Sequence, residues 1–227
     1  MTMAVKSQNP VLLAGEFSGL NQPIRRATSL FLSAALAIGN AVFSQDRFSQ
    51  EELMALPRVC HAQRVINNLL QTKIVPEAER RQWALRLGEK DYDAFHHYCW
   101  ALIYVRRAGA ANTPQHQVFN YRTAISNFEF VQQNASPLFP MMPEVNLRKG
   151  QTYRLLGDDG DAVKEFTQAI QLKPDYTPAY AALVEFYLDL NNLHGAEEIL
   201  AKGLVHAPES KILLKKKAEL ESRKRRN

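Results

Sequence analysis

Two histidines and a cysteine lie within four positions in the stretch FHHYCWAL, residues 95–102. His96 and Cys99 are three residues apart, so on a helix they share a face and could bind a metal ion with Cys60 as a third ligand. His96 could also act as the base for a nucleophilic Cys99. A third possibility is a Cys60–Cys99 disulfide, because the chain has two cysteines and no more. We favour the disulfide, which requires an oxidising compartment, over two buried free thiols and over a metal or catalytic site.

Other catalytic motifs are absent from the sequence. It contains no glycine-rich phosphate-binding loop, no HExxH zinc motif, no haem-attachment CxxCH and no GxSxG nucleophile elbow. The paired acids Asp158 and Asp159 follow Gly157, where aspartate is a common turn and cap residue. We therefore expect a binding module that is not an enzyme and uses no cofactor or metal. An enzyme or metal-binding protein centred on Cys60, His96 and Cys99 is the alternative.

The compartment is indicated by the N-terminal 44 residues. Arg25 and Arg26 precede an uncharged, largely apolar run, residues 27–44, with small residues at which cleavage could follow Ala41 or Ser44. This order of positive charge, apolar stretch and small residues is typical of a secretory signal. We predict a signal peptide or a retained membrane anchor, which would place the protein in the periplasm or cell envelope. A buried helix of a cytosolic adaptor is the alternative.

A repeat of 34 residues runs through the C-terminal half. Identical residues recur at this spacing in three pairs: Tyr153 and Tyr187, Ala162 and Ala196, and Pro174 and Pro208. With Gly150, Phe166 and Ala169 in the first copy and Tyr180, Leu183, Leu200 and Gly203 in the second, the pattern resembles the tetratricopeptide repeat (TPR). The first copy departs from it at Asn146 and Lys149, where the family prefers large apolar residues. These departures suit a first helix with an atypical neighbour.

The resemblance implies an all-α fold, a short right-handed α-solenoid of antiparallel helix hairpins closed by a C-terminal capping helix. Upstream, apolar periodicity predicts a degenerate hairpin with helices at 92–108 and 117–134, and Ser49 and Glu52 have the spacing of a capping box. No strand pattern is present. The expected organisation is a signal or anchor, a helical N-terminal part, two repeats, and a basic capping helix with tail, at residues 1–44, 45–140, 141–210 and 211–227.

In this family, partner segments bind in the concave groove that the first helices of the hairpins form. The resemblance places Arg148, Gln151 and Arg154 of the first copy and Ala182, Glu185 and Asp189 of the second in that groove. The lysine and asparagines of the carboxylate-clamping subset are missing, since Leu147, Gln151 and Ala182 stand at their positions. The resemblance therefore implies a protein–protein interaction scaffold or assembly adaptor whose ligand is not a chaperone C-terminal tail.

The positive charge of the chain lies in its tail. Residues 211–227 hold eight Lys or Arg and two Glu, whereas the other 210 residues hold 20 basic and 21 acidic side chains. Such a tail could contact an anionic surface, while a nucleic-acid partner is not expected because no aromatic residue interleaves the cations. The cations considered are Lys215, Lys216, Lys217, Arg223, Arg225 and Arg226. In a simple capping helix, Ile212, Leu213, Leu214, Ala218 and Leu220 would instead cover the last hairpin, with the lysines in water.

Overall fold

The computed structural model describes residues 48–226. Within this range every regular element is an α-helix and no strand occurs, so the predicted all-α class is confirmed. The predicted signal or anchor, residues 1–44, lies outside the described residues. The helices are α1 (Gln50–Met54), α2 (Arg58–His61), α3 (Arg64–Leu69), α4 (Glu77–Leu87), α5 (Glu89–Ala94), α6 (His96–Gly109), α7 (Pro114–Asn134), α8 (Met142–Leu156), α9 (Asp159–Leu172), α10 (Thr177–Asp189), α11 (Leu193–His206) and α12 (Lys211–Lys224).

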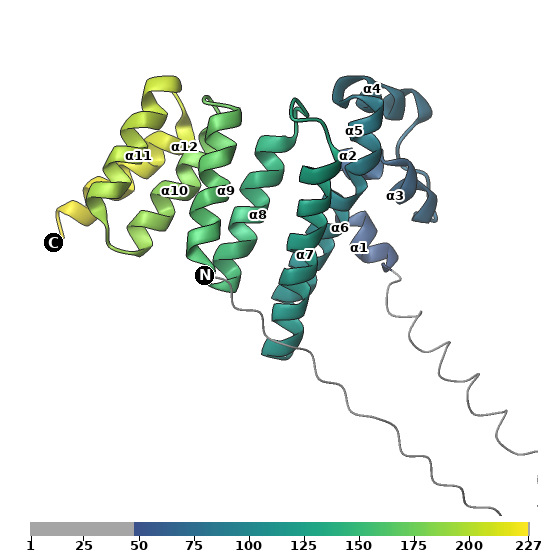
Figure 1. Cartoon of the computed structure of the whole chain (residues 1–227), viewed down its shortest axis with the longest axis horizontal. Coiled ribbons are helices and arrows are strands. Elements are labelled where there is room, and N and C mark those ends of the chain that lie inside the picture. Colours follow the sequence, from purple (N-terminus) through teal and green to yellow (C-terminus); the bar gives the residue numbers. More distant parts are fainter. Residues whose placement is uncertain (1–47, 227) are drawn as a thin grey trace, which may run out of the picture. The chain divides into compact units, whose positions relative to one another are not determined.

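From α6 onward the helices form a solenoid of antiparallel hairpins. Helices α6 and α7, α8 and α9, and α10 and α11 pair within hairpins, and each hairpin packs against the next (Figure 1). Helix α12 packs against both α10 and α11, as the first helix of a further hairpin would. The first helices of the hairpins, α8, α10 and α12, therefore lie next to one another across the array.

Small residues allow the repeat helices to approach closely. A Cβ atom on Gly150 would lie only 2.7 Å from the Phe166 ring, and one on Gly203 only 2.9 Å from Leu213 and from Tyr180. Real Cβ atoms do not come this close to other heavy atoms, so glycine is needed at both positions. Phe166 is fully buried. The residues that define the 34-residue pattern are thus packing residues, as expected.

Helix α7 begins earlier than the sequence analysis predicted. The Thr113 hydroxyl accepts a hydrogen bond from the His116 amide, and Pro114 occupies the first turn of the helix. Both residue types favour a helix start, so the helix begins at Pro114 and not at residue 117. At the other predicted start, Ser49 and Glu52 form the expected capping box before α1.

The N-terminal part consists of short helices because the chain is interrupted repeatedly. Pro57 and Pro76 precede α2 and α4, and Gly88, with φ at 83°, separates α4 from α5. Glycine suits this left-handed backbone conformation because it has no Cβ. Apolar side chains of these helices pack with α6, α7 and the start of α8 in one core cluster.

The capping role of α12 rests on fewer residues than predicted. Leu213 and Leu220 are fully buried against the last hairpin, but Ile212 and Leu214 remain 42% and 43% exposed. Ala218 is exposed as well. The prediction was wrong for these three residues. Leu213 and Leu220 are seven residues apart and lie on one face of the helix, and only this narrow face is buried against the last hairpin. Within the described residues, no helix is long and apolar enough to span a membrane.

Candidate functional site

Cys60 of α2 and Cys99 of α6 are joined by a disulfide, with their Cα atoms 5.6 Å apart. Both side chains are fully buried in the N-terminal core cluster. The bond connects the short N-terminal helices covalently to the first solenoid helix. Because both sulfur atoms are in the bond, neither is available as a thiolate ligand or nucleophile.

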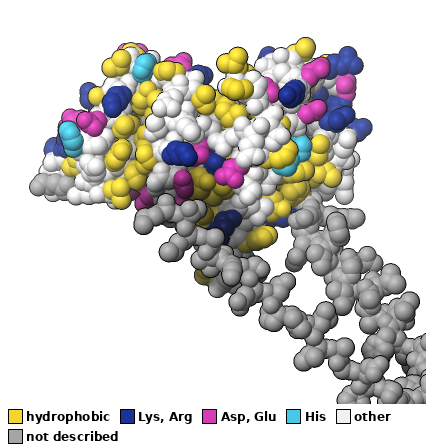
Figure 2. Space-filling view, in the orientation of Figure 1, with side chains coloured by type: hydrophobic (Ala, Val, Ile, Leu, Met, Phe, Trp, Pro, Cys, Tyr) yellow, Lys and Arg dark blue, Asp and Glu magenta, His cyan; other side chains and the backbone are white. Residues whose placement is uncertain are grey.

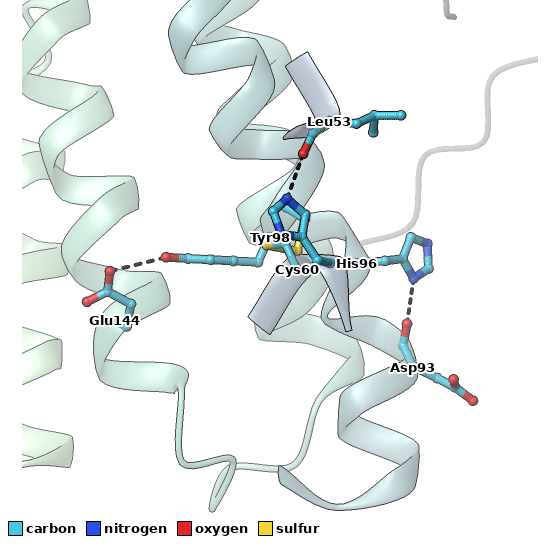
Figure 3. The surroundings of a disulfide bond; sticks show 8 residues. Leu53, Cys60, Asp93, His96, Tyr98 and Glu144 are labelled. Carbon is cyan, nitrogen blue, oxygen red and sulfur yellow. Dashed lines mark hydrogen bonds between the residues drawn. A yellow bond between two sulfur atoms is a disulfide. The ribbon is translucent and has the colours of Figure 1, made fainter. Parts of the chain in front are cut away.

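The histidines near the disulfide make separate hydrogen bonds. The His96 ring lies within hydrogen-bond distance of the Asp93 carbonyl, at 2.5 Å, and points away from the sulfur atoms (Figure 3). His61 bonds the Leu53 carbonyl at 2.9 Å, and His97 bonds Asn127 at 2.8 Å. Among the described residues no three His, Cys, Asp or Glu side chains converge as metal ligands. The alternative site at Cys60, His96 and Cys99 therefore does not form.

A groove of about 500 Å³ opens over α8, α10 and α12. Its floor contains the small residues Ala181 and Ala182, and its rim combines apolar and charged side chains. The sequence-predicted residues Gln151, Arg154, Ala182 and Glu185 line it, whereas Arg148 and Asp189 do not. The full lining is Gln151, Arg154, Leu155, Pro178, Ala181, Ala182, Glu185, Ile212 and Lys216.

Arg154 is fixed in position at one end of the groove. Its guanidinium donates to Asp189 at 2.7 Å, and it lies over the Phe186 ring at 5.8 Å. Asp189 lies within 3.8 Å of Arg223 from α12 as well. Asp189 therefore affects the groove through Arg154, because it holds the planar guanidinium in a fixed orientation.

Arg148 belongs to a different cluster. Its guanidinium donates to Glu144 at 2.7 Å, and Tyr98 of α6 reaches across to the same carboxylate at 3.1 Å (Figure 3). The Tyr176 hydroxyl donates to Glu144 as well. Burial, together with the Glu144 carboxylate, raises the pKa of Tyr98 and of Tyr176 above the usual tyrosine value. Arg148 thus helps to hold α6, α8 and the start of α10 together.

Lys216 is a groove residue that the sequence analysis assigned to the tail. Its ammonium lies 3.0 Å from Glu185 and 3.1 Å from Glu219. Desolvation alone would lower the pKa of Lys216, but hydrogen bonds to both carboxylates outweigh it and raise the pKa. The 34-residue period, continued one step from Ala182, leads to this position and could have identified it.

Some cations of the basic tail form ion pairs with acidic side chains. Lys216, Arg223 and Lys224 pair with acids of α10, α11 and α12. Lys215, Lys217 and Arg225 are exposed, and no ion pair holds them within residues 48–226. Basic and acidic side chains are interspersed over the face shown in Figure 2. Some of the cations predicted to contact an anionic surface are therefore held in ion pairs within the fold. A smaller exposed set remains available for such a contact.

The two residues that depart from the repeat pattern, Asn146 and Lys149, lie in a buried polar cluster. The Lys149 ammonium bonds Gln132 at 2.9 Å, Glu165 at 3.0 Å and Glu129 at 3.2 Å. Gln132 in turn donates to Asn146 and to Glu165. The atypical neighbour predicted for α8 is therefore α7, which supplies Gln132 and Glu129 in place of apolar side chains.

Part of the chain is similar to known proteins. Residues 153–220 match the family model described as tetratricopeptide repeat. No curated protein matches the chain. Among solved structures, a thermophilic TPR protein from Thermus thermophilus aligns with a TM-score of 0.47 and 22% identity, over 63% of this chain and 76% of that one.

The family match spans α9 to α11 and ends inside α12 at Leu220. It covers the second 34-residue copy, and it begins at Tyr153 within the first. The close helix contacts at Gly150 and Gly203 give these copies their physical basis. Residues 153–220 therefore match the tetratricopeptide repeat in both sequence pattern and helix packing.

Proposed function

We propose that this protein is a non-enzymatic scaffold or assembly adaptor of the bacterial cell envelope, which binds a segment of a partner protein in the groove over α8, α10 and α12. Tetratricopeptide repeats generally mediate protein–protein interaction. The observation that carries the proposal is the groove itself, where α8, α10 and α12 bring Leu155, Ile212 and side chains of opposite charge around two alanines of α10.

The residues of the groove indicate what kind of segment would bind. Leu155 is 58% exposed and Ile212 42% exposed, so both can bury apolar surface against a partner. Arg154 and Lys216 supply cations, and Glu185 an anion. A segment with one apolar anchor flanked by charges of both signs would match this rim.

Substitution of a groove leucine is expected to weaken partner capture strongly. Leu155→Asp places a carboxylate among the groove's apolar contacts without disturbing the core, and should weaken binding at least about tenfold. Val205→Asp is the matched control, because Val205 is 80% exposed on α11 and outside the groove lining. Mild crosslinking in native cell envelopes followed by affinity capture, then titration of the purified partner, measures the difference.

Three outcomes are possible for this pair of variants. Loss of one partner with Leu155→Asp and its retention with Val205→Asp support the groove. Equal capture by both variants contradicts the groove assignment. Capture of nothing by the unmodified protein contradicts the adaptor itself. Arg148 and Arg154 are poorer probes, since their ion pairs with Glu144 and Asp189 would also be lost.

The envelope location is supported by two features. Residues 1–44 have the order of a secretory signal, and a buried disulfide in a small protein is typical of oxidising compartments. The intact mass of protein isolated from its native cells without reductant tests both. We expect no thiol that reacts with an alkylating agent after denaturation, and either an N-terminus after Ala41 or Ser44 or a retained anchor. Full-length protein with two reactive thiols would contradict export.

A further inference from the structure

A second cavity, of about 600 Å³, lies between α7, α8 and α9 and shares no residue with the groove. Gln132 and Ala135 come from the end of α7, Met142, Asn146 and Lys149 from α8, and Gln168 from α9. Cavities of this size accommodate small ligands or a few residues of a peptide. The groove proposed above to bind a partner segment lies on the opposite face of α8, so this cavity has no role in that function.

Buried hydrogen-bonding groups form the base of the cavity. Lys149 and Glu165 are 6% and 4% exposed, and they bond each other and Gln132. All three Lys149 protons are used, toward Glu129, Glu165 and Gln132. Both amide protons of Gln132 are used as well. These groups build a rigid base and have no donor left for a ligand.

Asn146 is different, because only half of its amide is used. The residue is 3% exposed, and its side-chain oxygen accepts from Gln132 at 2.8 Å. Its amide nitrogen, which can donate two hydrogen bonds, has no hydrogen-bond partner in the described part of the chain. The nitrogen is not one of the enclosed atoms that lack a partner among the described residues, so it is open to the cavity that Asn146 lines. This free donor can therefore reach an acceptor on a ligand in the cavity.

The rim adds groups that both donate and accept. The side chains of Gln168 and Gln171 line the cavity. Within residues 48–226 neither makes a hydrogen bond to protein. Each amide offers two donors and an acceptor. Together with Asn146, these side chains can hydrogen-bond a planar ligand group that has both a donor and an acceptor. Another amide is such a group.

The charge of the cavity excludes a strongly ionic ligand. Lys149 and the rim residue Lys164 supply two positive charges, which Glu129 and Glu165 balance. A carboxylate would lie near Glu165, and an ammonium near Lys149. Apolar atoms of Ala135, Pro137, Met142 and Leu172 line the rest. An uncharged polar group with an aliphatic stem therefore fits best, and the lining has no aromatic ring against which a sugar could stack.

We propose that this cavity binds an uncharged amide, either an Asn or Gln side chain or a backbone peptide group of a partner's segment. The ligand carbonyl accepts from Asn146, and its N–H group donates to Gln168 or Gln171. The aliphatic stem of the ligand lies against Met142 and Leu172. The protein then has two binding faces, one on each side of α8.

N-acetylglutamine N-methylamide is the probe, titrated into the full isotope-labelled chain while the side-chain amide signals of Asn146, Gln132 and Gln168 are followed by NMR. We expect saturable shifts of these signals at probe concentrations on the order of 10 mM. Gln168→Met keeps the aliphatic stem and removes the amide, so binding should weaken about fivefold. Gln133→Met is the matched control and should leave binding unchanged, because Gln133 is exposed on α7 and lines neither the cavity nor the groove.

Further probes distinguish a side-chain amide from a backbone amide as the ligand, and they can also contradict the proposal. N-acetylmethionine N-methylamide has backbone amides only, so equal binding assigns the site to the peptide backbone, and weaker binding assigns it to the side chain. Tighter binding of N-acetylglutamate N-methylamide, of the lysine analogue or of glucose would overturn the amide assignment. Absence of saturable shifts with every probe, or equal effects of Gln168→Met and Gln133→Met, would overturn the site.

Discussion

Lys149→Met is expected to destabilise the fold by about 3–5 kcal/mol, although methionine matches the large apolar residue that the repeat pattern prefers. The reason is Glu165, whose side chain is 6% exposed and pairs with Lys149 at 3.0 Å. Without the ammonium, a carboxylate would remain buried with Gln132 as its other hydrogen-bonding neighbour. Urea unfolding followed by circular dichroism measures the loss.

The double variant Lys149→Met, Glu165→Leu distinguishes an ionic effect from a packing effect. Because both charges are then removed, its stability should return to within about 1 kcal/mol of the unmodified protein, as buried ion pairs can often be replaced by apolar residues. Lys164→Met, at the exposed neighbour of Glu165, is the control and should change stability by less than about 0.5 kcal/mol. If Lys149→Met alone does not reduce stability, the buried Glu165 carboxylate does not depend on the Lys149 ammonium as the contacts indicate.

Loss of the disulfide is expected to cost about 4 kcal/mol in the chain-entropy model, because the bond closes a loop with a sequence separation of 39 residues. Both cysteines are fully buried, so Cys60→Ala, Cys99→Ala is preferable to serine, which would bury an unpaired hydroxyl. The free energy of unfolding from urea titrations, with and without reductant, gives the effect.

Reductant provides the internal control for this experiment. It should destabilise the unmodified protein by a similar amount and leave the Cys60→Ala, Cys99→Ala variant unchanged. Limited proteolysis should also cut the variant first at Arg58 and Arg64, which lie on the helices that the bond fastens to α6. A loss below about 1 kcal/mol would mean that apolar packing of these short helices to α6 is sufficient by itself.

The repeats could be predicted from the sequence because their determinants are local and periodic. Gly150, Ala162 and Phe166 recur in type or in spacing, and a 34-residue period implies stacked hairpins. The capping box at Ser49 was predictable for the same reason, since it spans four residues. The Cys60–Cys99 pair followed from the cysteine count and the apparent signal, and it is present in the structure.

The other site features depend on neighbours distant in sequence. Nothing in the sequence pairs Lys149 with Gln132 or Glu165, which come from two other helices. The assignment of Arg148 to the groove came from family position alone. A local signal was nevertheless present there, because Glu144 lies four residues before it, and such pairs form readily on helices.

The apolar core of the described residues divides within α8. Most buried apolar side chains up to Val145 form one cluster, most of those from Leu147 onward belong to two others, and no member of a cluster is shared across this boundary. The Asn146 and Lys149 polar cluster lies at the division. Cooperative unfolding spreads through shared packing, so residues 48–145 and the repeats should exchange their backbone amide hydrogens as separate units. The N-terminal helices can then open transiently while the groove keeps its shape.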